Sequence, residues 1–292
     1  MKSSQSVRKV VIPAAGMGTR FLPITKAQPK EMLPVVDKPV IQYVVEEAIQ
    51  SGVEDILIIT GRNKRAIEDH FDRCFELESK FNNYEKNQFS EALKSLSDFP
   101  DIHFIRQREQ RGLGDAVLHA EKHCDNEPFA VLLGDTICLS PKNVSPCTRQ
   151  MIDAYDHYQR SIIAVEPVLK NKIKDYGIID GREIAKGIYE INDIIEKPAP
   201  ENAPSNLGAI GRYILTPDIF PLLHEGTPGV GGEIQLTDAL RKLDKPLGLV
   251  TNCRRYDIGD KLGWMKSSIE LTLEREEFAA ELRPFLSQLL KK

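Results

Sequence analysis

The sequence predicts an α/β fold: a doubly wound (Rossmann-like) mixed, mostly parallel sheet flanked by helices, with a smaller β region and a helical C-terminal tail. Three observations predict it. Apolar runs of strand length alternate with helical patterns through the first half, as in parallel strands joined by right-handed crossovers. The runs that begin at Lys9 and Phe129 are continuously apolar, as in strands buried on both faces. From Ser161 onward, strand-like runs follow one another with fewer helices between them, which predicts a mixed sheet edge.

The strands of the first half are expected at short apolar runs: 9–15, 56–60, 102–106 and 128–134. Helices are expected between them, because apolar residues recur at helical spacing after Pro39, after Asn63 and within 114–124. Pro39 suits the first turn of a helix, Gly52 suits the end of one, and Asn63 is a favoured N-cap. Residues 76–100 are polar and are predicted to leave the core.

The second half is expected to contain strands at 161–167, 187–196 and 209–215. Helices are expected at 218–224, at 233–243 and through the tail 261–292. Asp260 is interpreted as the N-cap of that tail. There is no internal repeat or low-complexity linker, which favours one catalytic domain with a helical appendage.

Composition excludes several classes of protein. A chain of 292 residues with 41% hydrophobic and 28% charged residues is typical of a soluble globular protein. Its apolar runs are far shorter than the roughly 20 residues of a membrane span, and the N-terminus lacks an apolar signal core, so we expect no membrane contact and a cytoplasmic location. The five cysteines are scattered without a Cys-x-x-Cys pair, which predicts reduced fillers rather than a disulfide framework or a zinc site. The net charge of −4 argues against a nucleic-acid partner.

The loop after the first strand is unusually basic. Residues 8–38 hold six basic and two acidic side chains, a local balance of +4, which suits a small, highly charged anion. Within 15–20, two glycines precede Arg20, an arrangement that lets backbone N–H groups approach a phosphate. Phe21 stands where a dinucleotide fingerprint needs its third glycine, and the chain has no P-loop string. A tight turn with a surface arginine is the alternative reading.

Lys30 lies in the same loop between Pro29 and Pro34, so a stiffened backbone presents its ammonium group. Asp135 follows an apolar run and therefore stands at the carboxyl end of a strand, where ligands bind in open α/β sheets. From position alone it could equally cap the next segment.

These segments resemble the signature of the sugar-1-phosphate nucleotidyltransferases, through Ala15-Gly-Met-Gly-Thr-Arg20 and Pro29-Lys-Glu-Met-Leu-Pro34. The resemblance extends from about residue 9 to about residue 278. Further matched segments follow in order: 38–43, 70–72, 112–117, 176–178, 196–198, 232–238 and 256–259.

The resemblance implies transfer of a uridylyl group from UTP to glucose 1-phosphate, with UDP-glucose and pyrophosphate as products. It implies a catalytic domain at 8–278, with a nucleotide half at 8–140 and a sugar half at 141–260, in a homodimer or homotetramer. A thymidylyl- or other nucleotidyltransferase stays open as an alternative, as does a non-catalytic nucleotide-sugar sensor.

The same resemblance implies roles for individual residues. Nucleotide-binding residues are expected at Ala14, Ala15, Gly16, Gly18, Thr19, Gln107 and Gly112. Catalytic cations are expected at Arg20, Lys30 and Lys197. Sugar binding is expected at Gly177, Glu196 and Lys197, with Glu233 and Gln235 as weaker candidates. The implied cofactor is Mg²⁺, held by Asp135 and Asp257, because this ion favours one or two carboxylates together with substrate phosphate oxygens.

Overall fold

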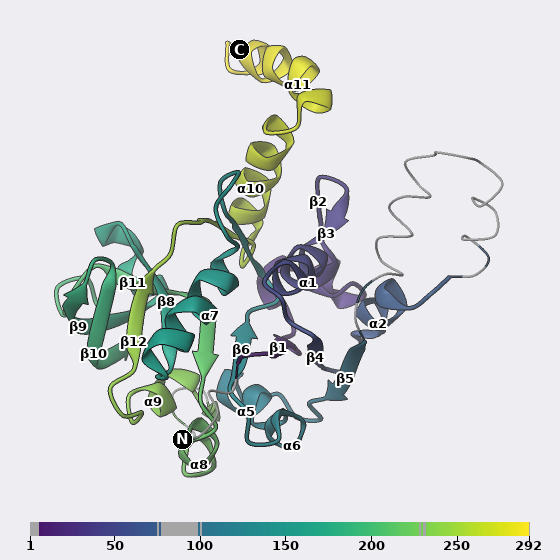
Figure 1. The fold of residues 1–292 in the computed structure, drawn as a ribbon. Helices are drawn as coiled ribbons and strands as arrows, with labels where there is room; N and C mark the ends of the chain where they lie inside the picture. The colour runs from purple at the N-terminus through teal and green to yellow at the C-terminus, as the bar shows by residue number, and fades with distance from the viewer. Residues whose placement is uncertain are drawn as a thin grey trace.

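The computed structural model describes residues 6–74, 76, 99, 101–227, 229 and 232–291. The excursion predicted at 76–100 lies outside the described residues except for Glu76 and Phe99. The architecture is a mixed α/β fold in which helices cover both faces of a central sheet (Figure 1).

The first half of the sheet is parallel. Its strands, in spatial order, are β5 (Ile102–Arg106), β4 (Asp55–Thr60), β1 (Lys9–Ala14) and β6 (Phe129–Leu132). Each coincides with a run predicted from apolar residues, although β4 begins one residue before the predicted run 56–60. In β1, Val10 and Ile12 pack on one face of the sheet while Val11 packs on the other, so continuous apolarity is what this central strand requires.

The second half of the sheet pairs differently. It continues with β11 (Leu207–Leu215), β8 (Ile162–Pro167), β12 (Leu247–Val250), β10 (Ile188–Glu196) and β9 (Gly177–Ala185). In this half, β8 and β12 pair in parallel. The remaining neighbouring pairs are antiparallel: β6 with β11, β11 with β8, β12 with β10, and β10 with β9. The expected mixed sheet is therefore confirmed, but the expectation of a mostly parallel one is wrong, because parallel pairing dominates only from β5 to β6.

Two sets of helices cover the sheet. One face packs against α1 (Val40–Gln50), α2 (Arg65–Phe71) and α7 (Cys147–Tyr158). The other packs against α5 (Leu113–Leu118), α6 (Glu121–Cys124), α8 (Ile219–His224) and α9 (Leu236–Leu240).

Several predicted helix boundaries need correction. The single helix expected at 114–124 is two short helices, α5 and α6, and the helix expected at 233–243 is reduced to α9. Asn63 does not cap α2: it adopts a left-handed backbone with φ of 66°, and Lys64 occupies the N-cap. Pro39 is the N-cap of α1 rather than its first helical residue. Helix α7 was not expected at all.

Two small ribbons connect the body to the tail. β2 (Pro34–Val35) pairs with β3 (Lys38–Pro39), and β7 (Thr136–Leu139) pairs with β13 (Arg254–Asp257). Their apolar side chains pack with Leu271 of α10 (Lys261–Leu273).

The tail itself is helical, as predicted. Asp260 caps α10 by accepting a 2.8 Å hydrogen bond from the Gly263 N–H. Helix α11 (Glu276–Leu289) buries none of its residues and projects away from the body in Figure 1. Among the described residues, no helix is long and apolar enough to cross a membrane.

Candidate active site

The carboxyl ends of β1, β4, β5 and β6 meet along one edge, because these strands are parallel. A cavity of about 360 Å³ lies there. Its lining includes eight residues predicted from sequence: Ala15, Gly16, Gly18, Thr19, Lys30, Gln107, Gly112 and Asp135. Ala14, which was also predicted to bind the nucleotide, does not line this cavity. It ends β1 and is only 1% exposed, so its side chain belongs to the core.

A second cavity of about 300 Å³ adjoins the first. It is lined by Gly177, Glu196 and Lys197, the predicted sugar-binding residues, and also by Arg255. The two cavities share Leu113, Leu133 and Glu233 in their walls. The residues predicted for nucleotide and for sugar therefore line adjoining parts of one cleft.

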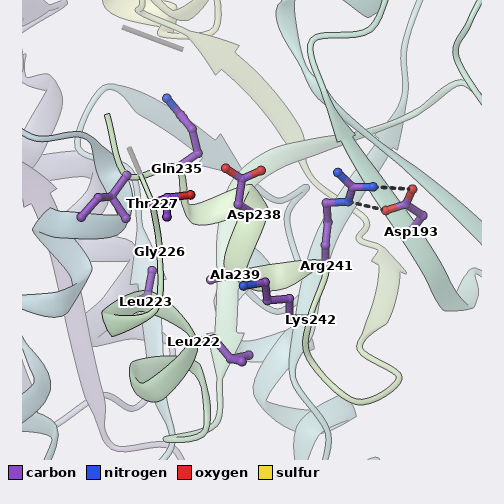
Figure 2. Close-up of a pocket in the computed structure, with 11 residues that line it drawn as sticks. Asp193, Leu222, Leu223, Gly226, Thr227, Gln235, Asp238, Ala239, Arg241 and Lys242 are labelled. Carbon is purple, nitrogen blue, oxygen red and sulfur yellow. Dashed lines mark hydrogen bonds and ion pairs between the residues drawn. The ribbon is translucent and has the colours of Figure 1, made fainter. Parts of the chain in front are cut away.

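A larger cavity, of about 470 Å³, lies elsewhere among the described residues, beside α8 and α9. Figure 2 shows its polar side chains, including Arg241, whose guanidinium donates to Asp193 at 2.7 Å. Of the predicted residues, only the weak candidate Gln235 lies in its wall.

The glycine loop is fixed by close packing against the lysine loop. Gly18 adopts φ of 66°, at the N-cap of a short 3-10 helix, Thr19–Phe21. A Cβ at this position would lie 3.0 Å from Thr25 Cγ2 and 3.2 Å from Lys30 Cβ. Glycine is therefore required both by the backbone conformation and by the approach of Lys30.

Lys30 and Asp135 interact directly. The Lys30 Nζ lies 2.5 Å from Asp135 Oδ2, and both side chains are only partly exposed. Burial alone would lower the pKa of Lys30, but the carboxylates of Asp135 and Glu31 raise it above its ordinary value. Burial opposes ionisation of Asp135, yet the Lys30 ammonium holds the pKa of this carboxyl below its ordinary value. Each residue therefore stabilises the charged form of the other.

A buried ion pair supports the Lys30 loop. Glu31 Oε2 accepts a hydrogen bond from Lys64 Nζ at 2.6 Å, with the two side chains 1% and 5% exposed. Burial raises the pKa of Glu31 and lowers the pKa of Lys64, and the pairing opposes both shifts. Lys64 precedes α2, so this pair ties the loop to the segment after β4. Sequence reasoning did not identify either residue.

The second predicted metal ligand, Asp257, lies beside Asp135. The β7–β13 ribbon places Asp257 opposite Thr136, and the Ile258 N–H donates to the Asp135 carbonyl at 3.1 Å. Asp257 accepts hydrogen bonds from Arg255 at 2.9 Å and from the Gly259 N–H at 2.8 Å.

Arg20 is exposed but reaches the same region. An ideal Cβ on Gly259 would lie 2.8 Å from Asp257 Oδ1 and 3.8 Å from the Arg20 guanidinium. Arg20 also acts on Lys30 electrostatically, as a neighbouring like charge. The structure thus brings Arg20, Lys30, Asp135 and Asp257 together.

The sugar-side residues meet where β9 and β10 pair. Gly177 lies opposite Glu196, and a Cβ on Gly177 would come within 3.3 Å of Glu196 Oε2. Lys197 adopts a left-handed backbone, with φ of 47°, and its N–H donates to the Tyr176 carbonyl at 2.9 Å. Its Nζ lies 3.3 Å from Glu196 Oε1.

Sequence reasoning missed Arg255, which lines the second cavity and contacts Asp257. Its side chain is 12% exposed, contacts the Tyr176 hydroxyl and lies 3.5 Å from Glu166. Its Nε is buried without a hydrogen-bond partner among the described residues. The only signal in the sequence was its place two residues before Asp257.

On the nucleotide side, Gln107 is held rigidly. Its amide nitrogen donates a hydrogen bond to Asp115 at 2.6 Å, and Gln107 is only 3% exposed. Gln110, which sequence reasoning also missed, donates to the Ala15 carbonyl at 2.6 Å and so connects the loop after β5 to the glycine loop.

Gly112 has φ of 103°, and a Cβ there would lie 2.6 Å from the Ile234 carbonyl oxygen. Glycine is therefore needed at position 112 both for the backbone conformation and for the close packing against Ile234.

Comparisons with known proteins show the family of this chain. Residues 9–261 match the family described as nucleotidyl transferase. The chain is 52% identical over 291 residues to UTP–glucose-1-phosphate uridylyltransferase YngB of Bacillus subtilis, covering 99% of this chain and 97% of that protein. It is 50% identical to a UTP–glucose-1-phosphate uridylyltransferase of Streptococcus pneumoniae, covering 99% and 98%.

Among solved structures, UDP-glucose pyrophosphorylase complexed with UDP-glucose superposes with a TM-score of 0.84 at 45% identity, covering 92% of this chain and 100% of that one. The family match spans most of the chain, and the relatives match it from end to end. The protein therefore belongs to the nucleotidyl transferase family.

Proposed function

We propose that the protein transfers a uridylyl group from UTP to α-D-glucose 1-phosphate and releases UDP-glucose and pyrophosphate. One observation carries this proposal: two adjoining cavities, one lined by the glycine loop and one by Glu196 and Lys197, share a wall. Lys30 and Asp135 line the first cavity, and Lys197 and Arg255 line the second. Relatives with about half of their residues identical bear this activity in their names.

Gln107 suits a pyrimidine base. Because its amide nitrogen is committed to Asp115, its amide oxygen is the group left to accept a hydrogen bond from the N3–H of uracil. Ala15 and Gly16 place backbone in the wall of the same cavity. The Gln107 amide cannot separate uracil from thymine, so a thymidylyltransferase is the alternative that the experiment must exclude.

The donor set fits a divalent cation, for which we propose Mg²⁺. Asp135 and Asp257 offer carboxylate oxygens from neighbouring strands, with side chains 24% and 50% exposed. Mg²⁺ favours such hard oxygen ligands and keeps several sites for phosphate oxygens and water. When bound, it would neutralise phosphate charge and orient the triphosphate.

Different residues of the chain would then bind the two substrates for an in-line displacement. The phosphate oxyanion of glucose 1-phosphate forms the new bond to the α-phosphorus of UTP as the bond to pyrophosphate breaks, so no protein base is needed. Arg20 and Lys30 offset the charge that develops on the departing pyrophosphate. Lys197 holds the attacking phosphate, and Glu196 accepts hydrogen bonds from sugar hydroxyls.

A matrix of nucleotides and sugar phosphates tests the proposal. UTP, dTTP, CTP and ATP would each be offered with glucose 1-phosphate and galactose 1-phosphate, with and without Mg²⁺, and pyrophosphate release would be measured. We expect the highest kcat/KM for UTP with glucose 1-phosphate and no turnover without a divalent ion. Faster turnover of dTTP would assign the protein to the thymidylyltransferases, and binding without turnover would assign it to the sensors.

We further propose the domain limits and assembly that the family resemblance implies: a catalytic domain at 8–278, with halves 8–140 and 141–260, and a helical tail 261–292 that mediates a homodimer or homotetramer. The tail exposes a set of large apolar side chains: Leu262, Met265, Ile269, Phe278, Phe285 and Leu289. Light scattering should give a mass of two or four chains, and Phe285→Asp should lower that mass.

We also propose a cytoplasmic location. All five cysteines are free thiols, as is usual for proteins of the reducing cytoplasm.

A further inference from the structure

Three cysteines gather behind the active site. Cys138 lies in β7, Cys147 is the first residue of α7, and Cys253 immediately precedes β13. Their Sγ atoms all lie within 4.8 Å of one another. All five cysteines are free thiols, and contacts between distant segments bring these three together although they are scattered along the sequence.

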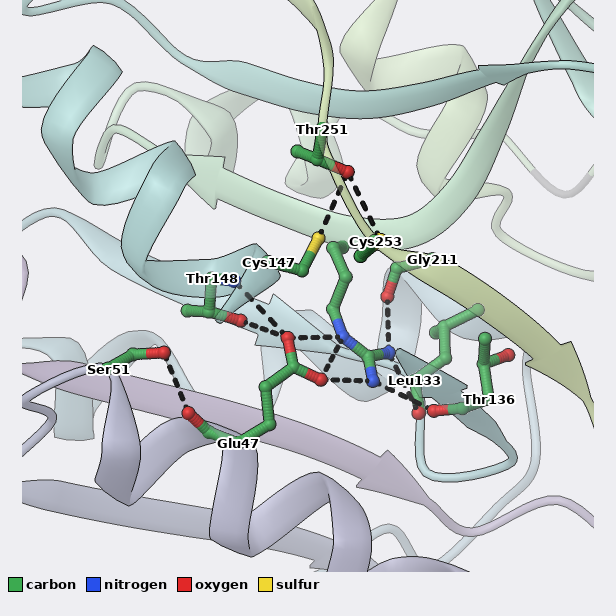
Figure 3. A network of polar contacts seen from close by, with 10 residues as sticks. Glu47, Ser51, Leu133, Thr136, Cys147, Thr148, Gly211, Thr251 and Cys253 are labelled. Atoms are coloured by element: carbon green, nitrogen blue, oxygen red, sulfur yellow. Dashed lines mark hydrogen bonds and ion pairs between the residues drawn. The ribbon is translucent and has the colours of Figure 1, made fainter. Parts of the chain in front are cut away.

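The cluster is largely closed to solvent. Cys138 and Cys147 are 4% and 0% exposed. Figure 3 shows the Thr251 hydroxyl between two of the sulfurs, with its Oγ1 3.4 Å from Cys147 Sγ and 3.3 Å from Cys253 Sγ. Three thiols therefore lie close together, and one hydroxyl contacts two of them.

These separations suit one tetrahedral ion. With Zn–S bonds of about 2.3 Å, two ligand sulfurs lie about 3.8 Å apart at tetrahedral angles, and a ligand oxygen lies about 3.6 Å from each sulfur. The three sulfurs, which lie within 4.8 Å of one another, reach this separation with shifts of about 1 Å or less, and Thr251 Oγ1 already lies 3.4 and 3.3 Å from two of them. Thiolates select soft ions such as Zn²⁺ over Mg²⁺.

The neighbouring charges are compatible with such an ion. The carboxylate of Glu47 is already committed, since it accepts hydrogen bonds from Arg212 at 2.7 Å and from the Thr148 hydroxyl at 2.6 Å. It therefore does not compete as a ligand. The buried Arg212 guanidinium interacts electrostatically with Cys138, which offsets part of the negative charge that three thiolates would bring.

We propose that Cys138, Cys147 and Cys253, with the Thr251 hydroxyl at the fourth position, bind one soft divalent cation of the Zn²⁺ type at a site separate from the catalytic carboxylates. Binding releases the three thiol protons and forms three metal–sulfur bonds. The ion would tie α7 to the β7–β13 ribbon. Because Asp135 precedes β7 and Asp257 ends β13, it would brace the ribbon that presents both carboxylates.

Cobalt is a direct probe of this site. The full-length protein, reduced with a phosphine and kept anaerobic with excess Mg²⁺, would be titrated with Co²⁺. We expect one equivalent to produce thiolate-to-cobalt charge-transfer absorption and the intense visible bands of tetrahedral Co²⁺, and Zn²⁺ to remove them. Cobalt bound by carboxylates gives no thiolate band, so the catalytic site is distinguished.

Two variants assign the ligands. Cys253→Ser should abolish the thiolate band or weaken Co²⁺ binding at least 10-fold. Cys74→Ser, which changes a similarly half-buried cysteine outside the cluster, should leave both unchanged. A thiolate band that persists unchanged in Cys253→Ser, or no band in the wild-type protein, would overturn the proposal.

X-ray absorption of the Zn²⁺-loaded wild-type protein gives a second measurement that does not depend on how a variant folds. Three sulfur neighbours at about 2.3 Å and one oxygen neighbour are expected. A shell of nitrogen and oxygen alone would reject the site.

Discussion

Lys30 and Asp135 form an ion pair in the wall of the cavity that the glycine loop lines, with 2.5 Å between Nζ and Oδ2. Lys30 comes from the loop after β1 and Asp135 from the turn after β6. The pair therefore connects two loops at the edge where the parallel strands end. The carboxylate proposed to hold the metal is therefore already charged and oriented by a lysine.

Replacing that lysine tests its catalytic role. Lys30→Met should lower kcat on the order of 10²-fold or more, because it removes one electrostatic group from the transition state. Pyrophosphate release at saturating UTP, glucose 1-phosphate and Mg²⁺ measures this. Lys26→Met is the matched control, since Lys26 is an exposed lysine of the same loop, and it should stay near the wild-type rate. Equal rates for the two variants would remove Lys30 from the mechanism.

The same pair predicts how stability depends on pH. The pKa of Asp135 is lower in the folded chain, so its contribution is present above the unfolded pKa of about 3.9 and is lost as pH falls through the folded pKa. In Lys30→Met this lowering is removed. Urea unfolding without divalent ions should therefore show a smaller loss of stability below about pH 4 in the variant than in the wild type. Parallel curves would mean that the pair does not stabilise the folded chain.

Lys197 should act on the other substrate. Lys197→Ala is expected to lower kcat/KM for glucose 1-phosphate on the order of 10²-fold while leaving the KM for UTP within about two-fold, because its ammonium lies in the sugar cavity. Lys186→Ala changes an exposed lysine in the turn between β9 and β10 and serves as the comparison. A larger effect on UTP than on the sugar phosphate would place Lys197 on the wrong substrate.

A second ion pair, deeper in the core, supports Asp135. Arg212 pairs with Glu47 at 2.7 Å and also donates to the Thr136 carbonyl at 2.8 Å, next to Asp135. Arg212→Met should destabilise the protein by about 3–5 kcal/mol, because Glu47 is left buried and unpaired.

The double variant Glu47→Leu with Arg212→Met should recover most of that stability, since replacing both partners of a buried pair by apolar groups is often neutral. Its kcat should stay reduced if Arg212 also positions the turn that carries Asp135. Chemical unfolding and turnover, measured on the same samples, separate the two effects. Full recovery of kcat would limit Arg212 to a structural role.

Much of the parallel half of the fold could be predicted, because each of its strands is a continuous apolar run between turn residues. Strands β9 and β12 could not. β9 lies at the sheet edge and exposes Arg182 and Glu183, so it lacks the expected apolar pattern, and β12 has only four residues, one of them Gly248. Antiparallel pairing in this half depends on contacts between distant segments that the local pattern does not encode.

The site divides in the same way. Lys30 and Asp135 could be found because each follows a buried strand or lies within a loop of distinctive composition. Arg255 and the Glu31–Lys64 pair could not, since an arginine in a polar run and a charged pair 33 positions apart look like solvated surface until the fold buries them. The cysteine cluster is the extreme case, since its three thiols come from separate segments of the chain.

Gly18 allows a matched test of the close packing in the glycine loop. Gly18→Ala places a methyl group 3.0 Å from Thr25 and 3.2 Å from Lys30 in a backbone with φ of 66°. Gly187→Ala has nearly the same φ, 73°, but its nearest neighbour is 3.7 Å away. Both should lose about 1–2 kcal/mol of stability from the left-handed backbone, and only Gly18→Ala should also lower kcat, by displacing Lys30. Similar turnover in the two variants would show that the packing of Gly18 does not position the lysine.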